Sequence, residues 1–114
     1  MSKQYNLDYL VSISEGDEEF IKDMVGTFIE DTPAELGKLK ELINAKSWTK
    51  VGEQAHKFSS SLMFLGLENL KAISYQIEIS GLENKNTELI PALLDELEAG
   101  CFNIIEELKH DFNV

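Results

Sequence analysis

Hydrophobic residues recur along this chain at steps of three and four, which is the spacing of one face of an α-helix. The first long stripe predicts a helix over about residues 17–45, with Asp17 as its N-cap. Pro33 lies inside it, and because proline lacks a backbone donor we expect a kink or a break near Thr32. The stripe consists of Phe20, Ile21, Met24, Val25, Phe28, Ile29, Leu36, Leu39, Leu42 and Ile43.

Three further amphipathic segments follow. Ser47 is placed to cap the next helix, and Gly66 ends that helix or marks a tight turn into the one after it, which stops near Gly81. Thr87 or a neighbour begins the last helix. The predicted seams are Trp48, Val51, Ala55, Phe58, Leu62 and Leu65, then Leu67, Leu70, Ile73 and Ile77, then Ile90, Leu94, Leu97, Cys101, Ile104 and Leu108.

The connections between these long helices are short, and strand signals are weak. An apolar cluster over residues 7–13 adds a short N-terminal helix. Short loops between long amphipathic helices favour antiparallel neighbours. The sequence therefore predicts an all-α fold, an antiparallel up-and-down four-helix bundle with a short additional N-terminal helix, as one domain over residues 1–114.

Charge narrows the range of partners. The 114 residues carry 10 basic and 21 acidic side chains, a formal net charge of −11. Such a field repels nucleic acid and anionic membrane surfaces, so we expect neither as a partner. The N-terminus shows no signal peptide, no stretch is long enough to span a membrane, and a single cysteine suggests a reducing compartment. We expect a cytoplasmic monomer.

Most signatures of catalysis or metal binding are missing. The chain has no glycine-rich phosphate loop, no HExxH and no CxxC. Cys101 falls in the apolar seam of the last helix, where a core role is favoured over a nucleophile. Glu106 and His110 share a helix face, but a site normally needs more ligands, and we interpret them as a solvated pair. We therefore expect no metal and no cofactor of the protein's own.

His56 differs, because it lies one position past the seam and turns toward the flank of its helix. Its neighbours on that face are Gly52, Ser59, Ser60 and, one turn further, Met63. Small residues around a histidine leave the imidazole open. Glycine and serine are poor helix formers, so their presence within a helix calls for an explanation. Close approach of a second protein is one explanation, and close packing of a neighbouring helix is the other.

An open imidazole suits one kind of chemistry. Neutral histidine presents a nucleophilic nitrogen at neutral pH and can form a phosphohistidine. We expect nothing to polarise the ring and no second acid or base beside it. The remaining electrostatic stabilisation of phosphoryl transfer would then come from the partner.

The run over residues 55–67 resembles the signature of histidine-containing phosphotransfer (HPt) domains. His56, Phe58, Ser60, Ser61 and Gly66 match it, and similar residues continue over nearly all of the chain. The resemblance implies an antiparallel four-helix bundle with the histidine exposed on its second helix. It also implies that His56 is the catalytic, phosphorylated residue.

By the same resemblance, His56 accepts a phosphoryl group from the aspartyl phosphate of one receiver domain and passes it to another. The implied partners are response-regulator receiver domains and a hybrid sensor histidine kinase, with Mg²⁺ held by the partner receiver domain. The protein would be a phosphocarrier without turnover of its own, not an enzyme.

Two positions depart from the family pattern. Ser59 stands where a lysine usually follows the histidine by three residues, and Ser60 stands where many members have glycine. Lys57 is a poor substitute because it points about 100° away on the helix. Lys22 and Lys71 are other cations that the sequence cannot place.

Three function classes remain open. The leading one is a phosphorelay carrier, supported by Ser59, Ser60 and Gly52 around His56 and docking through Met63 and Phe64. A binding module that docks or sequesters a receiver domain without transfer is the second, favoured by the missing lysine. A metal-binding bundle is the third, but it needs a second Glu-x-x-His pair, which the chain lacks.

Overall fold

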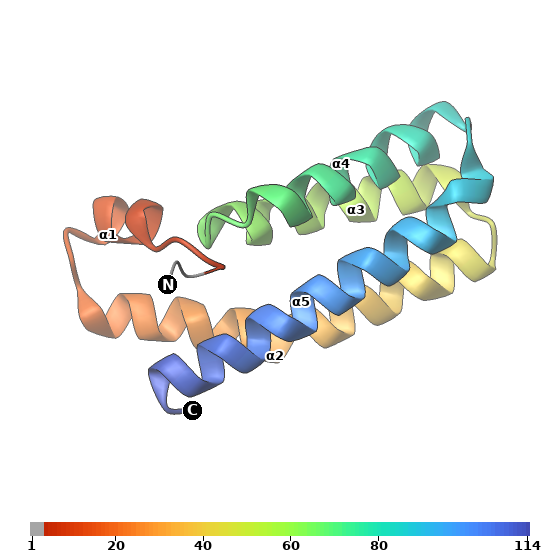
Figure 1. Cartoon of the computed structure of the whole chain (residues 1–114). Coiled ribbons are helices and arrows are strands. Elements are labelled where there is room, and N and C mark those ends of the chain that lie inside the picture. Colours follow the sequence, from red (N-terminus) through yellow and green to blue (C-terminus); the bar gives the residue numbers. More distant parts are fainter. Residues whose placement is uncertain (1–3) are drawn as a thin grey trace.

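The computed structural model describes residues 4–114, and in that range it is helical without strands (Figure 1). The predicted all-α bundle is confirmed. Its elements are α1 (Asp8–Ser14), α2 (Glu18–Asn44), α3 (Trp48–Phe64), α4 (Glu68–Glu83), the 3-10 turn η1 (Thr87–Leu89) and α5 (Ile90–Phe112).

The four long helices alternate in direction, as short connections require. Figure 1 shows α3 and α4 as one hairpin lying over α2 and α5, with α1 beside the turn between α3 and α4. The backbone N–H of Asn6 donates to the carbonyl of Leu65 at 2.8 Å, which ties the segment before α1 to that turn. Gly66 makes the turn with a φ of +63°, a conformation that favours glycine.

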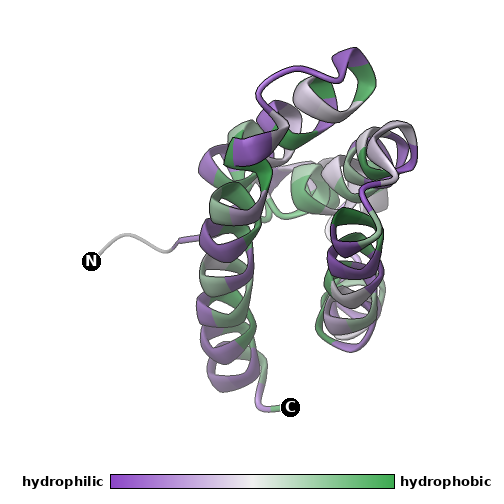
Figure 2. Cartoon of the chain, turned by 90° about the vertical axis from the view of Figure 1, so that its right-hand side faces the viewer, coloured by the Kyte–Doolittle hydropathy of each residue, from purple (hydrophilic) through white to green (hydrophobic). Residues whose placement is uncertain are grey.

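The predicted stripes meet in one core, and Figure 2 shows the hydrophobic side of each long helix facing its neighbours. Burying each large apolar side chain contributes roughly 1.5–3 kcal/mol. No helix of the described residues is long and apolar enough to cross a membrane. The most completely buried large side chains are Phe58, Leu10, Leu36, Leu39, Leu62, Leu65, Ile77, Ile90, Leu97, Leu108, Val25 and Val51.

The beginning of α2 is as predicted, whereas the helix has no break near Asp31 and Thr32. The Asp17 carboxylate accepts hydrogen bonds from the backbone of Glu19 and Phe20 at 3.0 and 3.2 Å. The helix then continues through Pro33 without a break. Thr32 just before the proline is buried, as are apolar residues a turn away on either side, so packing holds both halves of α2 on the same neighbours.

The end of α4 near Gly81 is as predicted. The helix runs on to Glu83 and ends where Asn84 adopts the left-handed conformation, with a φ of 53°. Gly81 is needed for a different reason. A β-carbon there would lie 2.7 Å from the carbonyl oxygen of Trp48 and 2.8 Å from the backbone nitrogen of Gly52. The two glycines let α3 and α4 approach closely.

Candidate functional site

His56 projects from the outer flank of α3. Val51, Ala55 and Phe58 of the same helix are buried in the core and fix which way the helix faces. One step past Ala55, the His56 side chain is 75% exposed. The imidazole is therefore carried by a rigid element yet open to solvent.

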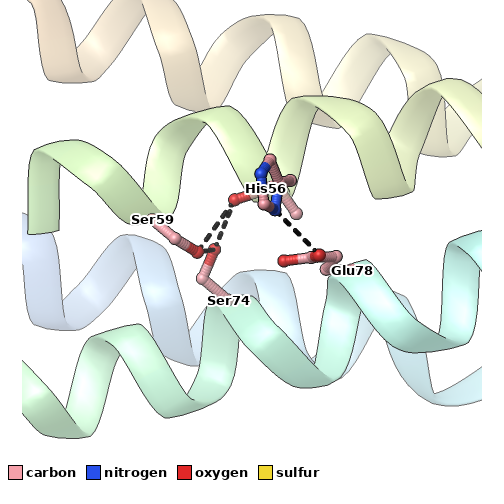
Figure 3. Close-up of polar contacts among 5 residues, drawn as sticks. His56, Ser59, Ser74 and Glu78 are labelled. Atoms are coloured by element: carbon pink, nitrogen blue, oxygen red, sulfur yellow. Dashed lines mark hydrogen bonds and ion pairs between the residues drawn. The ribbon is translucent and has the colours of Figure 1, made fainter.

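The ring is held by a carboxylate from the neighbouring helix (Figure 3). Nδ1 of His56 lies 2.9 Å from Oε2 of Glu78 on α4, and the Glu78 side chain is only 13% exposed. The expectation that nothing polarises this imidazole is therefore wrong. In the neutral tautomer that donates Nδ1–H to the carboxylate, Nε2 is unprotonated and carries the available lone pair.

Beside the histidine, two serines link the same helices (Figure 3). The buried Ser74 hydroxyl donates to the carbonyl of Ala55 at 3.0 Å. The Ser59 hydroxyl lies 3.0 Å from that carbonyl and 3.1 Å from Ser74 Oγ. This network fixes the backbone of α3 directly before His56, so the imidazole starts from a well-defined position.

A groove of about 530 Å³ runs along the outer side of the α3–α4 hairpin next to this pair. Met63, Ala72 and Tyr75 give it apolar walls, and the side chains of Met63 and Tyr75 are 38% and 58% exposed. Phe64 does not share the groove. Its ring packs on Tyr9 of α1, with centroids 5.6 Å apart.

The small residues near His56 have two different roles. Ser60 is exposed and lines the groove. Gly52 is buried instead, and a β-carbon there would lie 2.9 Å from the carbonyl oxygen of Glu78 and 2.6 Å from Cγ of Leu82. Close packing of a neighbouring helix therefore explains Gly52, whereas Ser60 faces open space.

The family model of the Hpt domain matches residues 23–109, which include both helices of this site. The chain belongs to the Hpt domain family. His56, the candidate histidine from the sequence, is on the second long helix of the bundle and is exposed.

A curated relative agrees with this Hpt assignment. The phosphorelay intermediate protein rdeA of Dictyostelium discoideum is 26% identical over 118 residues, covering 98% of this chain and 45% of that protein. This chain thus spans about half the length of that relative. The family match and this relative support histidine phosphotransfer in phosphorelay signalling as the class of function.

A solved structure is similar to this chain in fold. The crystal structure of histidine-containing phosphotransfer protein B (HptB) from Pseudomonas aeruginosa PAO1 has a TM-score of 0.85 to this chain. The match covers 99% of this chain and 97% of the HptB chain, at 21% sequence identity. The likeness confirms the helical bundle fold.

This Hpt domain replaces the usual lysine with Ser59, whose hydroxyl is turned into the α3–α4 contact. Lys57 is exposed and does not line the groove beside His56, and neither does Lys22. Lys71 of α4 does line it. Among the described residues, the one lysine that lines the groove therefore comes from the opposite helix.

Other candidate chemistry has no support in the described part of the Hpt domain. Residues 4–114 hold no group of three or more His, Cys, Asp or Glu side chains placed to bind a metal. Cys101 is fully buried, and burial, with the nearby charge of Glu98, raises the pKa of its thiol to about 12. A protonated, buried thiol is a poor nucleophile, which fits its predicted core role.

The sequence pattern did not indicate Glu78 and Ser74 as site residues, because they are far from His56 along the chain. One signal was available. Gly52 and Gly81 are about equally far from the Gly66 turn, and a pair of glycines at one level of a helical hairpin indicates where the backbones touch. That register places Glu78 beside His56.

Proposed function

We propose that this Hpt domain is a phosphocarrier and that His56 is its phosphorylated residue. The observation that carries the proposal is the exposed imidazole whose Nδ1 is bound by Glu78, so that Nε2 is the free nitrogen. The domain accepts a phosphoryl group from one receiver domain and delivers it to another. It completes no turnover of its own.

The step is a direct displacement at phosphorus. The Nε2 lone pair forms the N–P bond while the P–O bond of the aspartyl phosphate breaks, and the electron pair leaves on the aspartyl carboxylate. The proton stays on Nδ1, where Glu78 accepts it in a hydrogen bond and stabilises the positive ring. Delivery to the next receiver domain reverses the same events. Mg²⁺ and the remaining charge stabilisation belong to the receiver domain.

Docking uses the surface next to the histidine. The groove presents Met63, Ala72 and Tyr75 around an imidazole that protrudes beside them. Exposed apolar side chains next to a reactive group favour a protein partner over a small substrate. The proposed partners are receiver domains of response regulators and of a hybrid sensor histidine kinase.

The test uses the two histidines of the chain as a matched pair. The wild-type protein is incubated with a receiver domain phosphorylated on its aspartate. We expect an acid-labile, base-stable label that is lost in His56→Gln and retained in His110→Gln, because His110 lies on α5 away from the groove. Circular dichroism checks that both variants keep the helical content. Label that persists in His56→Gln would place the phosphorylation elsewhere.

The inward-turned Ser59 favours one alternative, a binding module that docks a receiver domain without efficient transfer. The same experiment separates the two functions. A module of this kind binds the receiver domain in a titration yet gains no label from it.

A further inference from the structure

We infer that Lys71 of α4 binds the phosphoryl group on His56, supplying from the opposite helix the positive charge that α3 lacks. This inference rests on the proposed function, because it concerns the phosphorylated form of His56. It adds a residue whose role is to hold the phosphoryl oxygens.

The need for a cation follows from the charges at the site. A phosphoryl group adds up to about two negative charges at neutral pH. The carboxylate of Glu78 is in contact with the same imidazole, and Glu68 lines the same groove. Like charges so close together destabilise the phosphorylated form unless a cation offsets them.

The residues next to His56 on its own helix cannot supply that charge. The Ser59 hydroxyl has one proton, and its partners are the carbonyl of Ala55 and Ser74 Oγ. Lys57 is exposed but lies outside the groove. The chain contains no arginine, so every candidate is a lysine.

Lys71 has the required position. It lines the groove together with His56, and it is the one basic residue among the described residues that do so. It precedes Glu78 by seven residues, two helical turns on the same stripe of α4, or about 10 Å along the axis. The four-carbon side chain of lysine is flexible and can extend along the groove toward a phosphoryl group that projects from the imidazole.

The side chain of Lys71 is also available. Lys71 is half-buried and lines the groove. A half-buried lysine can pack its methylene stem on apolar surface and keep its ammonium group in water. No ion pair engages it within the described range of the chain. An unpaired lysine beside an acceptor histidine is free to bind the incoming phosphoryl oxygens.

The experiment avoids a protein partner, so that docking does not enter. Phosphoramidate is the phosphodonor, and the initial rate of phosphohistidine formation is measured for the wild type, Lys71→Gln, Lys71→Arg and the control Lys57→Gln. The pH midpoint of the phosphoryl group on His56 is then measured by phosphorus NMR. The control removes the same charge from an exposed lysine outside the groove.

We expect Lys71→Gln to slow phosphorylation roughly 2- to 5-fold and to raise the phosphoryl midpoint by about 0.3 to 0.7, since a nearby cation favours the dianion. Lys71→Arg restores most of both values, and Lys57→Gln changes neither. A purely structural role of Lys71 would not move the midpoint.

The outcomes separate the two claims. A wild-type protein that neither phosphoramidate nor a phosphorylated receiver domain labels on His56 overturns the proposed function itself. Labelling with equal rates and midpoints in the wild type and Lys71→Gln overturns only the role of Lys71. Equal slowing in Lys71→Gln and Lys57→Gln would show an effect of net charge and would also overturn it.

Discussion

At the scale of single residues, the site is a histidine paired with one carboxylate. His56 alone would be an ordinary exposed imidazole, populating both neutral tautomers. The half-sheltered Glu78 removes that freedom, because its carboxylate accepts only from a protonated Nδ1. A hydrogen bond across two helices thus leaves Nε2 as the nitrogen for the proposed transfer.

Removing this carboxylate tests its role. We expect Glu78→Ala to slow phosphorylation of His56 roughly 10- to 100-fold, as is typical when a partner that orients a reactive histidine is lost. We expect Glu78→Gln to slow phosphorylation less, since the glutamine amide oxygen still accepts a hydrogen bond from Nδ1–H. The rate with phosphoramidate and the ¹⁵N shifts of the ring, which report the tautomer, are the measurements.

Glu53→Gln is the matched control, because Glu53 is an exposed carboxylate on α3 and its loss changes the net charge equally. A similar rate in Glu53→Gln and Glu78→Ala would contradict a specific role for Glu78.

At the scale of elements, the α3–α4 hairpin is the functional unit. Both partners of the His56–Glu78 pair and both linked serines belong to it. Their distances depend on how closely the two backbones approach, which Gly52 and Gly81 allow. The stability of the hairpin and the geometry of the site therefore share one cause.

Adding a side chain at this close contact should destabilise the protein. We expect Gly81→Ala to lower the free energy of unfolding by about 1–3 kcal/mol, because the new β-carbon meets the backbone of α3, which cannot move aside cheaply. Urea titration followed by circular dichroism measures it.

Gly37→Ala in α2 provides the comparison. No atom lies within 4 Å of the β-carbon it would add, so the better helix former should stabilise the protein by up to about 1 kcal/mol. If both substitutions stabilised the protein, the close α3–α4 contact would be wrong.

At the scale of the whole molecule, Cys101 reports on the integrity of the core. Its side chain is fully buried, and burial raises the pKa of the thiol from 9.0 to about 12. The unfolded chain therefore releases this proton near pH 9, while the folded chain keeps it. The contribution of the thiol to stability is present below pH 9 and is lost as the pH rises toward 12.

We expect the free energy of unfolding to fall more steeply above pH 9 in the wild type than in Cys101→Ala, by up to about 1.4 kcal/mol per pH unit. Denaturant titrations of both proteins from pH 7 to 10.5 measure the difference. Identical slopes would show that the thiol already ionises in the folded protein.

Thiol labelling gives an independent check at the same scale. At pH 8 we expect Cys101 to react with a soluble disulfide reagent only as fast as the core opens, and at full rate in denaturant. Rapid labelling of Cys101 in the native protein would contradict its burial between α5 and the rest of the core.

Much of this protein followed from local patterns. Helix faces were predictable because the three- and four-residue spacing of apolar side chains is visible within a short stretch of sequence. The cap at Asp17, the turn at Gly66 and the flank position of His56 likewise depend on a few adjacent positions. Packing overrode local preference at Pro33, where the chain continues as helix. Tertiary structure brought Glu78 and Ser74 to the histidine and Lys71 to the same groove. Their positions depend on the register between α3 and α4, which arises only when two glycine-bearing surfaces pack together.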